Sequence, residues 1–387
     1  MYVEKPNMVY IHVPFCVSRC IYCDFYSTTH TQELKDRYIQ TACAEIMYRR
    51  NELNNEPLQS VYIGGGTPSQ LDVRQIAQLL ETIHNAFELC NDAEITIEAN
   101  PDDITFDFVK GMKSLGINRV SLGVQSFDDD ILRIINRRHS AKEACRAVET
   151  IYNCDIENIS IDLIYGLPTQ TIKQFDNDLI CSFHLPIKHL SSYALSIEEG
   201  TTLDVMIRNG KLCPTDESLY IEAYNLLVTQ CNEHGFEHYE ISNFAQNGFA
   251  SRHNSGYWHG LPYLGIGPGA HSYDGKRTRR YNLPNLKAYA EAKNGNVGHS
   301  IEVLTEAEAF DELLFTSLRT REGLNLEGIK ARFPEKWISQ ILNDAQPHIV
   351  AGRLSLIGNR LVLTQKGIMT SNDVISDLMR AEMNVQL

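Results

Sequence analysis

The chain has 387 residues, of which 43% are hydrophobic and 22% charged, as in a globular protein of one large or several smaller domains. Its formal net charge of −14 disfavours binding to a phosphate backbone, so we expect no nucleic-acid partner. No apolar run approaches the roughly 20 residues that span a bilayer, and Met1 to Asn7 lack the apolar core of a signal peptide. We therefore expect a cytoplasmic protein whose membrane association is peripheral and through its partners.

The first half of the chain alternates short β-branched runs with longer amphipathic stretches. Strands are predicted at Met8–Val13, Ser60–Ile63, Glu94–Glu98, Arg119–Val124, Asn158–Ile164 and His189–Leu195. Helices are predicted at Gln32–Asn54, Asp72–Phe87, Phe106–Leu115, Asp129–Asn136, Ala141–Tyr152 and Ile172–Ser182. This alternation is typical of parallel β-α-β units. It predicts an α/β fold with a partial (β/α)6 barrel, with a doubly wound sheet as the alternative; a barrel carries its chemistry on the loops after the strands.

The second half changes composition twice. A helix pattern at Ser218–His234 precedes a stretch rich in Gly, Tyr and His, and a polar linker is predicted at 292–300. Beyond it come helix patterns at Thr305–Leu318, Leu326–Arg332 and Trp337–Gln346, a hairpin of Leu354–Ile357 with Arg360–Leu363, and a helix at Ile368–Met379. This order predicts a C-terminal α+β, winged-helix-like domain, and its excess of acidic residues argues against DNA binding. The predicted domains are 1–235, 236–298 and 299–387.

Three of the ten cysteines, Cys16, Cys20 and Cys23, lie together in the loop that follows the first predicted strand. Thiolates are the usual ligands of iron–sulfur clusters. Three of them hold three irons of a [4Fe–4S] cubane and leave the fourth iron open to a small molecule. A zinc site is the alternative, although zinc normally takes four ligands in CxxC-type pairs.

The cysteine loop, CVSRCIYCDF, resembles the CxxxCxxC motif of radical S-adenosylmethionine (SAM) enzymes. The resemblance covers nearly the whole chain and is greatest to the coproporphyrinogen-dehydrogenase-like branch of that family. It implies an oxygen-sensitive [4Fe–4S] cluster whose open iron chelates the amino and carboxylate groups of SAM. One electron from the cluster then cleaves SAM to a 5′-deoxyadenosyl radical.

Other polar residues at strand ends match positions that contact SAM in that family. Glycines after the second strand let the backbone approach a ligand closely, although such runs also form tight turns. A carboxylate within an apolar strand, such as Asp162, is costly unless it is paired or used; Glu98 alone would also suit a helix cap. The resemblance implies SAM contacts from Tyr10, Gly65, Gly66, Thr67, Glu98, Gln125, Arg137, Asp162 and Ala194.

The branch contains both oxidases and haem chaperones. The oxidases decarboxylate coproporphyrinogen III; they carry a fourth cysteine where this chain has Phe25, and an extension before the first strand, which only seven residues precede here. The chaperones carry an HNxxYW motif, present here at 253–258. Imidazole is an axial ligand of haem iron, and aromatic rings pack on the macrocycle. The haem-binding candidates are His253, Asn254, Tyr257 and Trp258, with His259 and His271 as alternative ligands.

The resemblance therefore implies a chaperone that binds haem and transfers it to acceptor proteins such as respiratory cytochromes. An oxygen-independent coproporphyrinogen III oxidase-type decarboxylase is the alternative. A basic cluster of Lys276, Arg277, Arg279 and Arg280 suggests a site for the haem propionates or for a partner, since arginine pairs well with carboxylates. A solvated surface loop is the alternative interpretation of that cluster.

Overall fold

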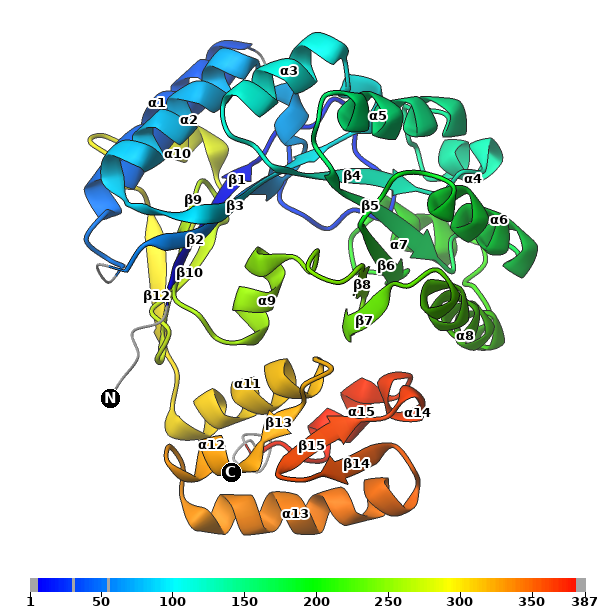
Figure 1. The fold of residues 1–387 in the computed structure, drawn as a ribbon. Coiled ribbons are helices and arrows are strands. Elements are labelled where there is room, and N and C mark those ends of the chain that lie inside the picture. Colours follow the sequence, from blue (N-terminus) through cyan, green and yellow to red (C-terminus); the bar gives the residue numbers. More distant parts are fainter. Residues whose placement is uncertain (1–5, 30–31, 54–55, 381–387) are drawn as a thin grey trace.

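The structure is a computed structural model that describes residues 6–29, 32–53 and 56–380. All six strands predicted in the first half are confirmed, and neighbours in the chain pair in parallel (Figure 1). They are β1 (Asn7–Val13), β2 (Leu58–Gly65), β3 (Leu89–Ala99), β4 (Arg119–Gln125), β5 (Asn158–Tyr165) and β6 (His189–Ala194). Because all six run the same way, the loops after them gather at one end of the sheet.

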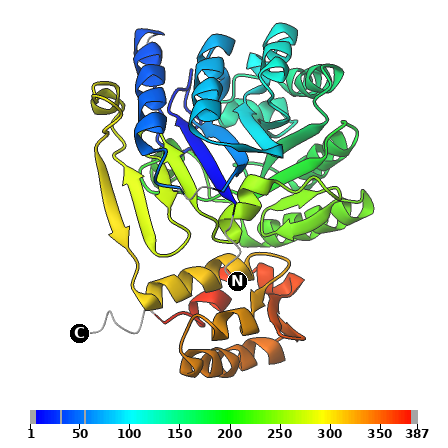
Figure 2. The same cartoon turned by 60° about the vertical axis from the view of Figure 1, so that its left-hand side comes forward.

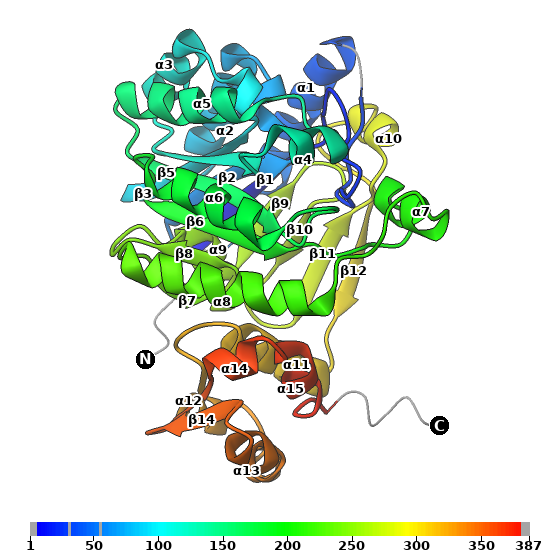
Figure 3. The same ribbon diagram turned by 90° about the vertical axis from the view of Figure 1, so that its right-hand side faces the viewer.

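Helices cover the outer face of this curved sheet (Figures 1 and 3). They are α1 (Gln32–Arg49), α2 (Val73–Ala86), α3 (Phe106–Ser114), α4 (Asp129–Ile134), α5 (Ala141–Asn153), α6 (Ile172–Phe183) and α8 (Glu217–Glu233). Helix α7 (Thr202–Arg208) lies beyond the ends of the strands, where Leu203 packs with Ile21 of the cysteine loop (Figure 3). Capping boxes begin α2, α5 and α6, at Asp72, Ser140 and Thr171. Nowhere in the described ranges is a helix long and apolar enough to cross a bilayer.

The first helix is shorter than predicted. It ends at Arg49, where the chain turns and the backbone N–H of Glu52 donates to the carbonyl of Arg49. The buried guanidinium of Arg49 bonds Glu45 and Glu52 and reaches the carbonyl of Gly265, which fixes the helix end against the sheet. The last predicted residue of the helix, Asn54, lies outside the described residues.

The sheet continues beyond the six predicted strands at both edges and has twelve strands in the described chain (Figure 2). One edge adds β9 (Tyr263–Ile266), parallel to β1, and then antiparallel β10 (His271–Tyr273), β11 (Thr278–Asn282) and β12 (His299–Val303). The other edge adds β8 (Asn243–Ala245), antiparallel to β6, and then β7 (Glu237–Glu240), antiparallel to β8. The prediction of an open α/β barrel is confirmed, but it missed these short strands, and β12 begins within the predicted linker.

The C-terminal module has its own apolar core and a three-stranded antiparallel sheet, as an α+β domain should. It contains α11 (Glu306–Leu318), β13 (Leu324–Asn325), α12 (Leu326–Lys330), α13 (Glu335–Val350), β14 (Leu354–Ile357), β15 (Arg360–Leu363), α14 (Gln365–Ile368) and α15 (Ser371–Ser376). The predicted hairpin is confirmed. The predicted helix at Ile368–Met379 is wrong, because the backbone leaves the helical conformation at Thr370 and two short helices form.

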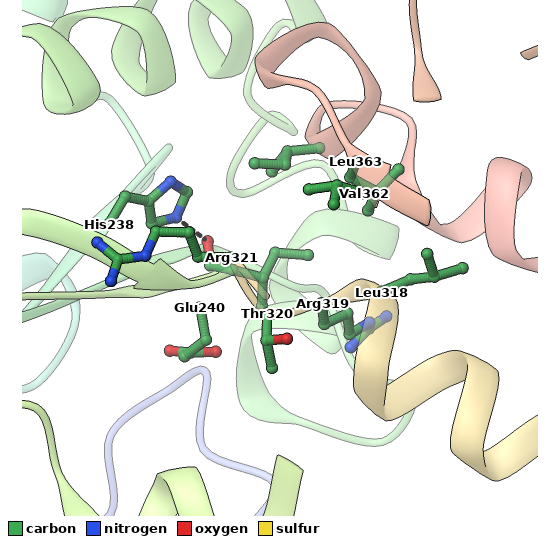
Figure 4. A pocket seen from close by; sticks show the side chains of 10 residues that line it. His238, Glu240, Leu318, Arg319, Thr320, Arg321, Val362 and Leu363 are labelled. Carbon is green, nitrogen blue, oxygen red and sulfur yellow. Dashed lines mark hydrogen bonds between the residues drawn. The ribbon is translucent and has the colours of Figure 1, made fainter. Parts of the chain in front are cut away.

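The module docks on the edge strand β7. Two backbone hydrogen bonds join them, from Ile241 to Arg319 and from Arg321 to Tyr239, at 2.9 and 3.0 Å. This contact covers the otherwise open edge of the sheet. A cavity of about 120 Å³ lies beside it, with Glu240 on the barrel side and Arg319 on the module side (Figure 4). Burial raises the pKa of Glu240 to about 7, although hydrogen bonds from Asn243, the Ser242 backbone and the Trp258 side chain oppose the rise.

Candidate functional site

A cavity of about 430 Å³ opens where the parallel strands end. Most of the residues implicated in cluster and SAM binding line it, although they come from loops spread over the first half of the chain. They are Cys16, Cys20, Cys23, Gly65, Gly66, Thr67, Glu98, Gln125, Arg137, Asp162 and Ala194. Tyr10 is not among the lining residues, because its hydroxyl turns to the His12 ring, 3.1 Å away.

The three motif cysteines are half-buried free thiols on one wall of this cavity. Cys16 Sγ accepts a hydrogen bond from the Thr67 hydroxyl at 3.4 Å, and Cys20 Sγ accepts one from Arg137 at 3.4 Å. Within the described residues, no three His, Cys, Asp or Glu side chains converge on a single metal ion. The three thiols line the same cavity, and their part as ligands of an iron–sulfur cluster stays a prediction.

The glycine run at 64–66 is required by packing. A Cβ on Gly65, whose φ is +113°, would meet the His12 ring at 2.6 Å. A Cβ on Gly66 would lie 3.1 Å from Cys16 Sγ and 2.9 Å from the carbonyl of Phe15. The glycines therefore bring β2 against the cysteine loop. The Gly66 N–H already donates to the carbonyl of Val13, so the part that these glycines play toward a ligand stays a prediction.

Arg137 is one of two arginines that line the cavity, with Arg19. Its Nη2 donates to Asn100 Oδ1 at 2.8 Å and to the Gly123 carbonyl, and its buried Nε has no partner among the described residues. Nearby Gln125 has a positive φ of 69°, which a residue with a side chain rarely adopts. Such strain clusters at functional sites, and here it accompanies an arginine with an unused donor.

Two carboxylates, those of Glu98 and Asp162, line the same cavity as Arg137. Glu98 accepts from the Tyr62 hydroxyl at 2.7 Å and from the Gly65 N–H at 3.0 Å, and Asp162 accepts from the Ser121 hydroxyl at 3.3 Å. Burial raises the pKa of Glu98 to about 7, with a smaller contribution from the charge of Asp162. Burial also raises the pKa of Asp162. Both side chains therefore gain from a ligand that brings hydroxyl or ammonium donors.

The HNxxYW motif lies at the opposite end of the barrel, on helix α9 (Arg252–Trp258). This helix packs on the beginnings of β1 and β2: a Cβ on Gly256 would meet Met8 Sδ at 2.1 Å. Gly256 therefore allows α9 to pack closely against β1. In Figure 1 the helix lies inside the curve of the sheet, above the C-terminal module.

His253 is only 1% exposed, and both of its ring nitrogens are hydrogen-bonded. Nδ1 lies 2.9 Å from the Ser60 hydroxyl, and Nε2 lies 2.9 Å from the Tyr257 hydroxyl. Burial, with a smaller effect of the Arg119 charge, lowers the pKa of His253 to about 3. The imidazole is therefore neutral, the form that binds metals, but it must give up one of these bonds before it can ligate iron.

The other haem-binding candidates differ in exposure. Asn254, Tyr257 and Trp258 are half-buried, while His259 and His271 are exposed. His259 lies 3.5 Å from Glu322 of the C-terminal module, and the His271 ring stacks on Tyr281. The imidazole of His253 is therefore buried, whereas those of His259 and His271 are exposed to solvent.

The basic residues after His271 do not form one patch. Arg279 pairs with Glu312, Arg280 bonds Glu52, and Arg277 donates to the carbonyl of Leu304. Arg279 and Arg280 alternate along β11 and so point to opposite faces of the sheet. The role of this cluster toward the haem propionates or a partner therefore stays a prediction.

Sequence reasoning missed several residues that line the large cavity. Asn100 orients Arg137, and Ser121 holds Asp162. Tyr193 and Glu198 line the wall formed after β6. Asn100 follows the third strand directly, so its place after a parallel strand was a usable signal; Ser121 lies within its strand, and only the register with β5 brings it to Asp162.

Comparisons with known proteins agree with this geometry. The family model of the Radical SAM superfamily matches residues 10–179, and that of the HemN C-terminal domain matches residues 304–370. The heme chaperone HemW of Bacillus subtilis is 34% identical over 373 residues, which are 94% of this chain and 97% of the relative. The chain belongs to the HemW family. HemW of Mycobacterium tuberculosis H37Rv is 35% identical over 97% of this chain and 95% of the relative.

The fold of this HemW-family chain also matches a solved structure, that of coproporphyrinogen III oxidase (HemN) from Escherichia coli. The TM-score is 0.85, and the match covers 98% of this chain and 91% of the oxidase at 22% identity. At that identity the likeness establishes the radical SAM fold and leaves the reaction open. Membership of the radical SAM superfamily implies a [4Fe–4S] cluster and SAM, and the cysteine wall with its adjoining polar cavity fits both.

Proposed function

We propose that this chain is a haem chaperone that binds haem and passes it to an acceptor protein such as a respiratory cytochrome. The observation that carries the proposal is one fold with two polar ends: a cavity lined by three thiols at the ends of the strands, and the HNxxYW helix at their beginnings. The names of the relatives in the HemW family support haem as the cargo.

At the cavity end, we propose that Cys16, Cys20 and Cys23 hold the cluster, which when bound supplies an electron to SAM. The remaining residues bind and orient SAM. The unused Nε of Arg137 offers a charged donor to the SAM carboxylate. Glu98 and Asp162 offer acceptors to its hydroxyl and amino groups, and burial of these acceptors strengthens each bond.

At the other end, we propose that His253 is the axial ligand and that Tyr257 and Trp258 contact the macrocycle. The neutral imidazole supports this role, and haem binding then requires α9 to release His253 from Ser60 or Tyr257. His271 and His259 are the alternative ligands, because both are exposed without rearrangement.

An oxygen-independent coproporphyrinogen III oxidase is the second candidate, since the fold matches that enzyme. Phe25 argues against it. Its side chain stands at the position of the oxidases' fourth cysteine, is 63% exposed and lines the cavity, so that position has no thiol.

An anaerobic haem titration of the reconstituted chain, followed by visible absorbance, tests the proposal. Wild type is compared with His253→Ala, His259→Ala and His271→Ala, and with His184→Ala, an exposed, unrelated histidine directly after α6. We expect one saturable equivalent, weakened by His253→Ala alone.

Saturable binding that weakens only in the His271 or His259 variant would keep the chaperone function and move the axial ligand. No saturable binding in wild type would overturn the chaperone function. Conversion of coproporphyrinogen III by the reconstituted chain would then establish the second candidate.

A further inference from the structure

Tyr62 of β2 contacts both ends of the barrel. Its hydroxyl donates to Glu98 Oε1 in the cavity at 2.7 Å. The face of its ring stacks on the His253 ring, with centroids 5.0 Å apart and planes 30° apart. In this way one rigid side chain touches both a carboxylate implicated in SAM binding and the histidine implicated in haem binding.

His253 and the beginning of α9, which lie on the other side of the Tyr62 ring, are also held in place by hydrogen bonds. His253 is held by Ser60 of β2 and by Tyr257 of its own helix. The beginning of α9 is held by the buried Glu94 carboxylate, which accepts from the backbone N–H groups of Arg252 and His253 at 3.0 and 3.2 Å. A shift of the Tyr62 ring therefore meets a helix that has little freedom to absorb it without exchanging hydrogen bonds.

We propose that Tyr62 is a positioning residue that couples the cavity to the HNxxYW helix, so that SAM and haem each change the affinity of the other. The inference rests on the proposed function. A ligand hydroxyl that bonds Glu98 competes with Tyr62 for the carboxylate. Because a phenol is planar and rigid, its hydroxyl cannot move without moving the ring that supports His253. Such coupling is reciprocal between the two ligands.

Other side chains near Glu98 are alternative candidates for the link between Glu98 and His253. The charged or titratable side chains that interact electrostatically with Glu98 are Tyr10, Tyr62, Arg119, Asp162, Tyr193 and Tyr257. Arg119 is fully buried and its charge acts on both Glu98 and His253, but no hydrogen bond in the described residues joins it to either. Among the described side chains, Tyr62 is the one that combines a hydrogen bond to Glu98 with a ring stack on His253.

Tyr62→Phe tests the proposal, because it removes the hydroxyl and keeps the ring. Tyr289→Phe is the matched control. Like Tyr62, Tyr289 donates its hydroxyl to a glutamate at 2.7 Å, but its partner Glu45 lies on α1, on the outer face of the sheet. The full-length chain is reconstituted anaerobically, and haem is titrated with and without saturating SAM.

In wild type and Tyr289→Phe, we expect SAM to change the haem dissociation constant by roughly fivefold or more. In Tyr62→Phe the ratio falls to about one while both ligands still bind. The inference is overturned if Tyr62→Phe keeps the wild-type ratio, or if wild type binds both ligands and shows no coupling. Failure of wild type to bind haem would instead overturn the proposed function.

A pH profile separates positioning from a general loss of structure. The hydrogen bond from Tyr62 lowers the pKa of Glu98, so its removal raises that pKa further. If SAM binds the carboxylate form, its affinity falls with decreasing pH from about 7 in wild type and from a higher pH in Tyr62→Phe. An identical profile in both proteins would show that Tyr62 does not position Glu98.

Discussion

The two ends of the barrel differ in how much of their hydrogen-bonding capacity is already used. At the cavity end, Arg137 Nε has no hydrogen-bond partner in the part of the chain that the structure describes, and both Glu98 and Asp162 have a raised pKa. At the helix end, both nitrogens of His253 are bonded, and Glu94 accepts three hydrogen bonds from the beginning of α9. The first end is prepared for a ligand, and the second is closed around its own side chains.

This difference bears on how each ligand enters. A polar ligand at the cavity end can form hydrogen bonds to groups that are not fully satisfied. Because such buried groups are costly when unpaired, these hydrogen bonds favour binding. If haem binds at the other end, as proposed, α9 must open first, so the observed haem affinity is reduced in proportion to the fraction of chains in which α9 is closed. A carrier benefits from such a cost, because release restores the closed helix.

The largest effect is expected from the cysteines. Replacing Cys16, Cys20 and Cys23 by serine removes the thiolates on which the cluster depends, so reconstituted iron and visible cluster absorbance should be lost entirely. The control replaces Cys43, Cys145 and Cys181, which lie on three helices, and should retain the cluster. A cluster that survives in the first variant would show that the iron is bound elsewhere.

Next in size is the effect of Glu98→Gln on SAM binding. Hydrogen bonds to charged groups contribute about 1.5–3 kcal/mol, so SAM affinity should fall roughly 10- to 100-fold. The decline in affinity below pH 7 should also flatten, because no carboxylate remains to be protonated there. Calorimetric titration between pH 6 and pH 8 measures both effects, with the exposed Glu149→Gln on α5 as control. Unchanged affinity would remove Glu98 from the SAM site.

The smallest effect is expected at the closed end. Glu94→Gln weakens the three hydrogen bonds at the beginning of α9 and should lower the free energy of unfolding by about 1–3 kcal/mol. Iron content should stay at the wild-type value, because Glu94 does not line the cavity. Chemical denaturation and iron analysis measure the two quantities, with exposed Glu88→Gln as control. A loss of iron together with the loss of stability would show that the two ends of the barrel depend on each other.

The residues that could be predicted from sequence are those placed by a repeating pattern. Parallel strands bring the loops after Val13, Ala99 and Tyr165 together whatever their spacing, so most of the cavity lining was within reach. The helix end followed no such pattern: Ser60 and His253 are 193 positions apart and meet only through the packing of α9 on β2. Tyr62 was also missed, because its contact with His253 depends on the packing of α9 and its hydrogen bond to Glu98 depends on strand register.

The short strands at the sheet edges also escaped prediction. Strands β8 and β10 have three residues each, too few for an alternating pattern to show. Their pairing is decided by neighbouring strands rather than by their own composition.

Hydrogen–deuterium exchange across residues 251–260, with and without haem, tests the central claim most directly. If haem binds His253, α9 must open, and the amides of Arg252 and His253 that now donate to Glu94 should exchange faster in the haem-bound chain. SAM alone should leave most of the protection in place. Saturation with haem while these two amides stay as protected as in the haem-free chain would contradict the account and place the haem away from the HNxxYW helix.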